Sequence, residues 1–312
     1  IWKGLVGSEM CIRDSIESVQ SIRNYAPRRF AAQNRAVTAT DYEALLPSIY
    51  PNIESVSAYG GEDLDPPQYG RVFIAAKPRN GSFLAESTKT DLLRSLKSYS
   101  VAGIVPSFID LKFLYVELDS YIYYNTNFVG DSNSLRSKIT DSVNQYSRSG
   151  ELNKFGGRFK YSKMTSVIDG VDSSITSNIT NVIIRRNLKS MINVFTQYEL
   201  CFDNQFYHEL DSYNIKSTGF SVSGIDGTVY IADQVIQGSN TGNLFLFKLT
   251  DDIDVEIVST NVGTVDYKKG EVLINTINIT STLLPENIIE IQAVPLSNDC
   301  LLYTSDAADD GL

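Results

Sequence analysis

The sequence holds few of the residues on which most enzyme and metal sites depend. Its 312 residues include one histidine, three cysteines and one tryptophan. A Ser–His–Asp triad, a Cys–His pair or a zinc site would each have to use His208, whose neighbours Phe206, Tyr207 and Leu210 are typical of packing. Neither GxxxxGK[ST] nor GxGxxG occurs, so a phosphate-cradling loop is not indicated. We therefore expect no catalytic residues, no cofactor and no metal ion.

Positive charge and long apolar runs are also scarce. The chain has 27 Lys and Arg residues against 37 Asp and Glu, a net charge of −10. This balance argues against broad nucleic-acid binding, because such binding needs cations that displace counterions from phosphates. No apolar run reaches the roughly 18 residues of a membrane span. Because 42% of the residues are hydrophobic, we expect a globular protein without a nucleic acid, membrane or small-molecule substrate as its partner.

The acidic loop that contains Glu62, Asp63 and Asp65 is the one local cluster of carboxylates that suggests a Ca²⁺ or Mg²⁺ site. It lacks the alternating spacing and the closing Glu of an EF-hand, and Pro66 and Pro67 follow it directly. These features favour a solvated turn. Carboxylates are plentiful elsewhere, but nothing in the sequence singles out a glycosidase pair.

Both ends of the chain look foreign to the fold. The start contains GSEMCIRDS and the end reads CLLYTSDAADDGL, and both strings resemble read-through translation of sequencing-adapter DNA. A secretory signal is the alternative at the start, but Glu9 and Arg13 interrupt any continuous apolar segment. We therefore expect residues 1–15 and 300–312 to be non-native tails. The remaining residues 16–299 are then a fragment with a single cysteine, which excludes an internal disulfide.

A helix is predicted shortly before Pro51. Tyr42, Leu45 and Leu46 recur at spacings of three and four and form one apolar face. Thr40 is followed three residues later by Glu43, a spacing that predicts a capping box at the start of the helix.

The rest of the first half predicts further strands and helices in the order ββαβααβ. Strands are expected at residues 53–59, 71–77, 108–125 and 175–183, and helices from the stripes Leu92–Leu96, Leu135–Ile139 and Met164–Ile168. Within residues 108–125 the alternation slips by one residue after Phe113, which indicates a bulge or a strand that changes sheet. We predict an α+β domain over residues 16–190, with helices on one face of a mixed or antiparallel sheet.

After Met191 the helical stripes stop. Short β candidates follow, separated by glycine turns at Gly219, Gly242 and Gly270. This pattern predicts a smaller β-rich domain over residues 191–299, either a sandwich or a barrel.

One compact basic and aromatic cluster stands out, and it contains Tyr25, Arg28, Arg29, Phe30, Asn34 and Arg35. A nucleic-acid contact is one interpretation. Three arginines in an acidic chain favour protein docking more, since Arg and aromatic residues are enriched at interface centres. Docking and a plain solvated surface both stay open, and we predict a protein–protein interface as the site hypothesis.

Two segments carry a resemblance to a known family. Residues 26–46, APRRFAAQNRAVTATDYEALL, resemble the signature of phage baseplate proteins of the J-like class, and more closely that of the wedge proteins called gene product six in T4-like contractile-tail phages. Residues 263–274, GTVDYKKGEVLI, resemble the family's G-x-x-[DN]-Y-x-x-G turn. The pattern itself predicts a hairpin, with Val265 and Tyr267 on one strand and Val272 on the other. Two signatures in the family's order are more specific than either alone.

The resemblance implies the C-terminal half of a longer wedge protein in the virion's tail baseplate, assembled in the host cytoplasm. It implies dimers of the protein within a ring, with neighbouring wedge and sheath-initiator proteins as partners, and no enzymatic activity or cofactor. Three alternatives remain: a receptor- or carbohydrate-binding tail module, a tail-associated hydrolase, and the same subunit in a genome-free contractile injection particle.

Overall fold

The computed structural model describes residues 19–64, 66–79, 83–109, 111, 113–128, 131–149, 152, 155, 157–210, 212–250 and 254–302. The chain forms two compact units, and the division falls between residues 111 and 112. The predicted tail at residues 1–15 lies outside the described residues. In the described part, no helix is both long enough and apolar enough to cross a membrane.

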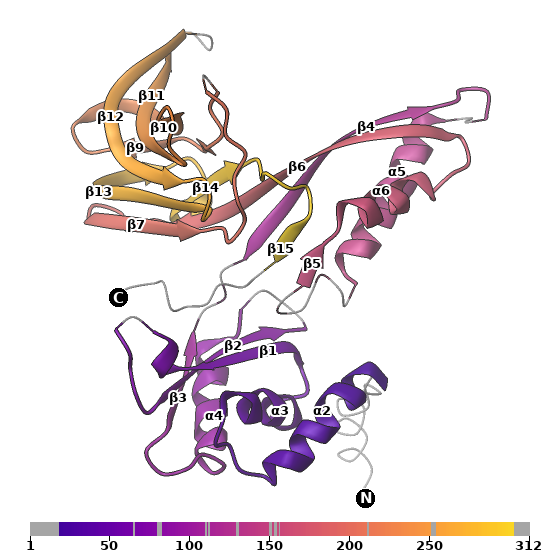
Figure 1. Ribbon diagram of the computed structural model, residues 1–312, viewed down its shortest axis with the longest axis vertical. Coiled ribbons are helices and arrows are strands. Elements are labelled where there is room, and N and C mark those ends of the chain that lie inside the picture. Colours follow the sequence, from indigo (N-terminus) through magenta and orange to yellow (C-terminus); the bar gives the residue numbers. More distant parts are fainter. Residues whose placement is uncertain are drawn as a thin grey trace, which may run out of the picture. The chain divides into compact units, whose positions relative to one another are not determined.

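Unit 1 is a three-stranded mixed sheet covered by helices (Figure 1). Strands β1 (Ile53–Gly60) and β2 (Arg71–Pro78) are antiparallel, whereas β3 (Val105–Ile109) runs parallel to β2. The helices are α2 (Val19–Ala32), α3 (Ala39–Ile49) and α4 (Glu86–Lys97), and a short 3₁₀ helix η1 (Gly61–Asp63) follows β1. The buried core joins Tyr42 and Leu46 of α3 and Leu96 of α4 to Ile74 of β2. Thus the apolar stripes predicted for these helices do face the sheet.

The start of α3 differs from the prediction, because the capping pair lies two residues earlier. The backbone N–H groups of Thr38 and Val37 donate to Asp41 Oδ2 at 2.9 and 3.0 Å. Burial raises the pKa of Asp41, but these hydrogen bonds outweigh it and hold the pKa below its ordinary value. The predicted Thr40–Glu43 box is therefore wrong, and Glu43 is free to contact other elements.

Unit 2 is built on a ten-stranded sheet, in which five strands close into a barrel. The barrel strands are β9 (Phe220–Val222), β10 (Ile225–Val235), β11 (Thr241–Thr250), β12 (Asp254–Asp266) and β13 (Glu271–Thr282). Each pairs with the next, and β13 pairs back to β9. Strand β7 (Phe195–Cys201) adds to β13. A sandwich and a barrel were both predicted for the β-rich segment, and the structure shows the barrel.

The same sheet continues from the barrel into a long two-stranded ribbon (Figure 1). Strands β8 (Lys216–Ser217) and β14 (Ile288–Ala293) lead to β6 (Ile175–Lys189), and β6 pairs with β4 (Leu114–Tyr124). Helices α5 (Ser132–Ser147) and α6 (Tyr161–Asp169) lie against this ribbon, and η2 (Pro285–Asn287) precedes β14. Asp131 caps α5, because its side chain accepts hydrogen bonds from the N–H groups of Asn133 and Ser134. An α+β fold with a β-rich part is thereby confirmed.

The domain boundaries differ from the prediction in two ways. The slip in alternation after Phe113 marks the passage between the two units, because β3 belongs to one sheet and β4 to another. No break occurs near residue 190, where β6 pairs with β14 up to Lys189. In β6 the buried side chains of Ile184 and Leu188 alternate with more exposed neighbours, so the predicted boundary at residue 190 falls at the end of a half-buried strand.

The expected tail at residues 300–312 also enters the fold in its first residues. Strand β15 (Cys300–Leu302) pairs antiparallel with β5 (Gly157–Phe159), and the side chain of Cys300 is 1% exposed. Burial raises the pKa of the Cys300 thiol to about 12. Residues 300–302 thus lie within the described fold, whereas the expectation placed all of residues 300–312 outside it.

Candidate interface site

The predicted cluster lies on the second half of α2 and on the turn that follows it. Arg28, Arg29 and Phe30 belong to α2, and Asn34 and Arg35 lie between α2 and α3. The backbone of Tyr25 belongs to α2 as well, but its side chain lies outside the described residues. The structure thus keeps these residues in one local segment.

The turn after α2 is held to the body of unit 1. Gln33 and Asn34 both adopt left-handed backbone conformations, with φ of 48° and 58°. Asn tolerates this conformation better than most residues because its short polar side chain bonds locally. The N–H of Ala36, which is fully buried, then donates to the carbonyl of Tyr99 at 2.8 Å. Arg35 therefore projects from an anchored turn.

Arg28 is tied to its own unit by one ion pair. Its guanidinium lies 3.4 Å from the carboxylate of Glu43 on α3. The same carboxylate accepts a hydrogen bond from the N–H of Ala58 in β1 at 3.0 Å, so Glu43 joins α2, α3 and β1. An ion pair this exposed stabilises the fold by about 0–1 kcal/mol.

Apart from Arg28, the described side chains of the cluster point to solvent. Phe30 is 84% exposed, the most exposed large hydrophobic residue in the described part of the chain. Arg29 and Arg35 are also exposed, and within the described residues neither forms an ion pair. One aromatic ring and two free guanidinium groups are thus available to a partner.

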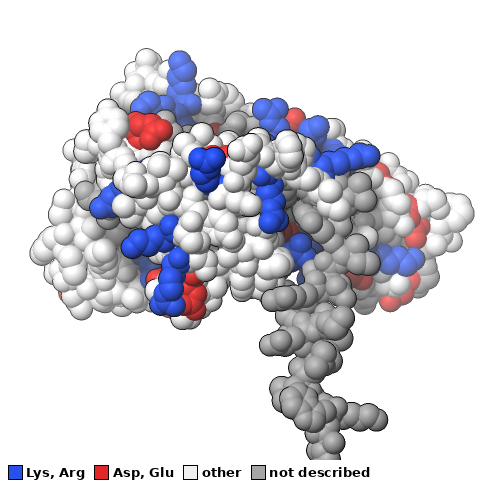
Figure 2. Space-filling model, turned by 90° about the horizontal axis from the view of Figure 1, so that it is seen from below, with Lys and Arg blue, Asp and Glu red and all other residues white. Residues whose placement is uncertain are grey.

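Figure 2 views the molecule from below and shows how charge is spread over that face. Lys and Arg side chains are scattered singly or in small groups across it, and several have Asp or Glu beside them. A binding surface for a nucleic-acid backbone gathers its cations along a stripe. The cations on this face form no such stripe.

The residues considered for catalysis or metal binding form no common site in the described part of the chain. His208 stacks on Tyr267, with ring centroids 4.9 Å apart and 16° between the planes, and its Nδ1 atom is buried without a hydrogen-bond partner. Glu62 lies on η1 and is exposed, whereas Asp65 lies outside the described residues. Across the residues that the structure describes, no three His, Cys, Asp or Glu side chains converge to hold a metal ion.

The second family-like segment forms the β12–β13 hairpin, and its tyrosine is fully buried. The chain turns at Tyr267, directly after β12 rather than within it, and the Tyr267 hydroxyl donates to Asp233 Oδ2 at 2.6 Å. Asp233 Oδ1 accepts the N–H groups of Asn214 and Ile215, both at 2.7 Å. Burial and then the carboxylate raise the pKa of Tyr267, so its hydroxyl stays a donor. Sequence analysis did not identify Asp233, because a single Asp in an apolar strand belongs to no recognisable motif.

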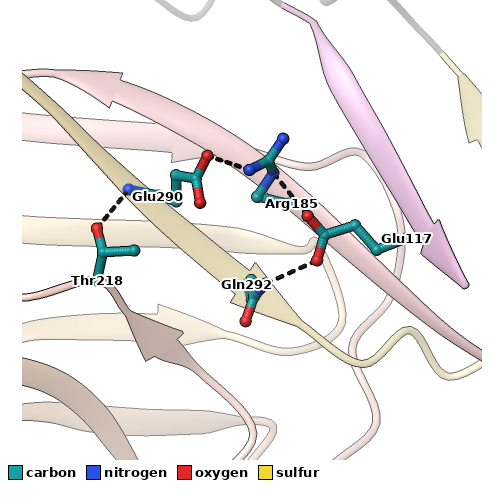
Figure 3. Close-up of polar contacts among 5 residues, drawn as sticks. All are labelled: Glu117, Arg185, Thr218, Glu290 and Gln292. Carbon is teal, nitrogen blue, oxygen red and sulfur yellow. Dashed lines mark hydrogen bonds and ion pairs between the residues drawn. The ribbon is translucent and has the colours of Figure 1, made fainter. Parts of the chain in front are cut away.

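A second polar network lies on the outward face of β4, β6 and β14 (Figure 3). Arg185 lies 3.0 Å from Glu117 and also pairs with Glu290. Gln292 Nε2 donates to Glu117 Oε2 at 2.7 Å, and the N–H of Glu290 donates to Thr218 Oγ1 at 3.0 Å. The network ties the barrel side of the sheet to the ribbon. Sequence reasoning missed it because Arg185, Glu117 and Glu290 come from three separate strands.

Two family models match consecutive parts of the chain. The model described as baseplate structural protein gp6, C-terminal domain I, matches residues 38–109. The model described as baseplate structural protein gp6, C-terminal domain III, matches residues 112–187. The gap between the two matches coincides with the division between the two structural units.

Individual relatives are also similar to parts of the chain. The baseplate wedge protein gp6 of Enterobacteria phage T4 is 28% identical over 176 residues, which cover 56% of this chain and 26% of that protein. The chain thus spans about a quarter of the length of this relative. A chain of the 6-fold symmetrised cryo-EM structure of the anti-feeding prophage baseplate is 14% identical, with a TM-score of 0.37, over 53% of this chain and 37% of that one.

Proposed function

Because the chain carries C-terminal domains I and III of the gp6 type of phage baseplate structural protein, we propose that it serves as a wedge subunit of a contractile tail baseplate. In this role it self-associates and joins neighbouring wedges into the inner ring of the baseplate. One observation carries the proposal: the two matched domains adjoin at the boundary between two independently packed units. A ring subunit needs such rigid bodies and exposed faces.

We assign the cluster on α2 to docking of a neighbouring baseplate protein, with Phe30 as the aromatic anchor and Arg29 and Arg35 beside it. Interfaces depend on a few aromatic and Arg side chains near their centres. A partner with acidic side chains fits the two free guanidinium groups. Tyr25, Arg28 and Asn34 complete the predicted site at its edge.

We assign no catalytic role to the chain. The protein relatives are structural, and in the described residues His208 is occupied in packing against Tyr267. Assembly in the virion is then the whole activity, and the partners are other proteins.

Co-assembly tests this function. The chain is expressed together with the baseplate proteins encoded beside its gene, and complexes are separated by gradient sedimentation and viewed by electron microscopy. We expect the chain in ring or wedge complexes, and as a dimer by light scattering when it is alone. A trimer that stays outside these complexes would instead indicate a receptor- or carbohydrate-binding tail module. Particles purified from the native source that contain the subunit but no capsid would assign it to an injection particle.

A further inference from the structure

Strand β4 is an open edge of the large sheet. It stands last in the strand order and, among the described residues, pairs with β6 alone. An open edge presents unpaired N–H and C=O groups, and proteins usually protect it with Pro, Lys or a short strand. The edge strand β3 of unit 1 is short and contains Pro106. By contrast, the eleven residues of β4 include no Pro, Lys or Arg.

The outward face of the ribbon next to this edge carries exposed aromatic and apolar side chains beside the polar residues Asp119 and Asn181. Tyr121 and Tyr123 are 57% and 56% exposed, and Ile179, which lies opposite Tyr121 on β6, is 53% exposed. The opposite face is different, because it packs against the main core through Val182 and Ile184. Within the described part of the chain, no hydrogen bond or ion pair involves the side chains of Asp119, Tyr121 or Tyr123.

We propose that β4 of one copy pairs antiparallel with β4 of a second copy and that this contact makes the dimer. The inference rests on the self-association proposed above and names its surface. An antiparallel pair of identical strands has a two-fold axis, so each copy offers the same residues to the other. Both open edges then disappear in one step, and the aromatic faces of the two ribbons join into one surface.

The charges of β4 select the position of the two-fold axis. An axis at Asp119 would place the two Asp119 side chains directly opposite each other, and like charges in opposed positions destabilise a strand pair. An axis at Ser120 instead places Asp119 opposite Tyr121 of the second copy, which avoids the pair of like charges. It also keeps most of β4 paired. Of these two positions, the proposal therefore takes Ser120 as the axis.

Charge variants of Tyr121 test this geometry in the whole chain. We expect Tyr121→Glu to raise the dimer dissociation constant about tenfold or more. Each copy then places its new carboxylate opposite Asp119 of the other copy, which gives two like-charge contacts per dimer. Tyr121→Lys should keep the constant within about threefold of the original, since it makes an opposite-charge pair in the same place. The double variant Asp119→Lys with Tyr121→Glu should restore dimerisation. Light scattering over a concentration series measures each constant.

Tyr69→Glu is the matched control, because Tyr69 is 81% exposed and belongs to unit 1. It should leave the dimer unchanged. A cross-link gives a second measurement: with Cys11→Ser to remove background, Tyr121→Cys should give a covalent dimer with a short bis-maleimide. Tyr69→Cys should give none. The remaining cysteines, Cys201 and Cys300, are buried.

The outcomes separate the two proposals. If the chain dimerises and all the variants dimerise equally well, the β4 contact is overturned and the wedge function stands. If the unaltered chain is a monomer at every concentration, the β4 contact is overturned together with the self-association on which it rests. A dimer lost in Tyr121→Glu and regained in the double variant supports the β4 pair, because a folding defect would not be rescued by a second charge.

Discussion

The two segments that resemble the family occupy opposite environments in the structure. Residues 263–274 form a hairpin whose Tyr267 is fully buried and bonded to Asp233. Residues 26–46 begin on the exposed part of α2, where Phe30 is 84% exposed, and end in the buried face of α3. The two segments therefore meet different physical demands. Residues 263–274 stabilise the fold, whereas the first half of residues 26–46 exposes its side chains to solvent.

The comparison predicts opposite responses to substitution. A change in the hairpin should lower the free energy of unfolding, because its polar groups have no access to water. A change on α2 should leave that free energy nearly unaltered and weaken assembly. Variants in the hairpin therefore measure stability, and variants on α2 measure assembly.

The largest effect is expected for Asp233→Ala. This change leaves the N–H groups of Asn214 and Ile215 and the hydroxyl of Tyr267 without an acceptor in the core. Each unsatisfied buried group costs about 1–3 kcal/mol, so we expect a loss of about 4 kcal/mol in the free energy of unfolding. Urea unfolding followed by circular dichroism measures it. Asp226→Ala, an exposed change on the same strand β10, should cost less than about 0.5 kcal/mol.

A loss below about 1 kcal/mol for Asp233→Ala would show that water enters the barrel and replaces the carboxylate. The hairpin would then resemble the surface of α2 more than a core.

A somewhat smaller effect is expected for Gly270→Ala, with Gly238→Ala as its match. Both glycines have nearly the same left-handed backbone, with φ of 78° and 77°. A Cβ at Gly270 would lie 2.1 Å from the carbonyl oxygen of Asn204, whereas a Cβ at Gly238 meets nothing within 4 Å. The left-handed conformation costs about 1 kcal/mol in both variants, and the clash adds about 2 kcal/mol in the first. The difference between their urea midpoints isolates the clash, and equal midpoints would contradict a tightly packed turn.

Local periodicity was enough to predict most elements of the fold. The stripes on α3, α4, α5 and α6 and the strands β1, β2 and β6 lie where apolar spacing and turn residues placed them. These signals are local, since a buried face repeats every three to four residues in a helix and every second residue in a strand. The barrel was one of two predicted forms, because closure depends on the pairing of β10 with β11, which no single strand reveals.

Long-range partners account for what sequence reasoning missed. Asp233 and Tyr267 are far apart in the chain, and so are Arg185, Glu117 and Glu290, so no spacing relates them. The unit boundary was visible as the slip after Phe113, but a bulge gives the same signal. For the candidate site, composition identified the cluster on α2, while the exposure of Phe30 and the ion pair of Arg28 required coordinates.

The smallest effect on stability, and the clearest on assembly, is expected for Phe30→Ala. A side chain that is 84% exposed loses little burial when truncated, so the free energy of unfolding should change by less than about 0.5 kcal/mol. If Phe30 anchors a neighbouring baseplate protein, its removal should lower the co-sedimenting fraction about tenfold, equivalent to about 1.4 kcal/mol of binding.

Ile22→Ala is the control on the same helix, because Ile22 is 47% exposed but lies outside the cluster and should affect assembly less than Phe30 does. Dimerisation should survive both changes, since the proposed self-contact lies on β4. Equal sedimentation of both variants with the unaltered chain would assign the α2 cluster to plain solvated surface, and the exposed half of the first signature would then have no role in docking.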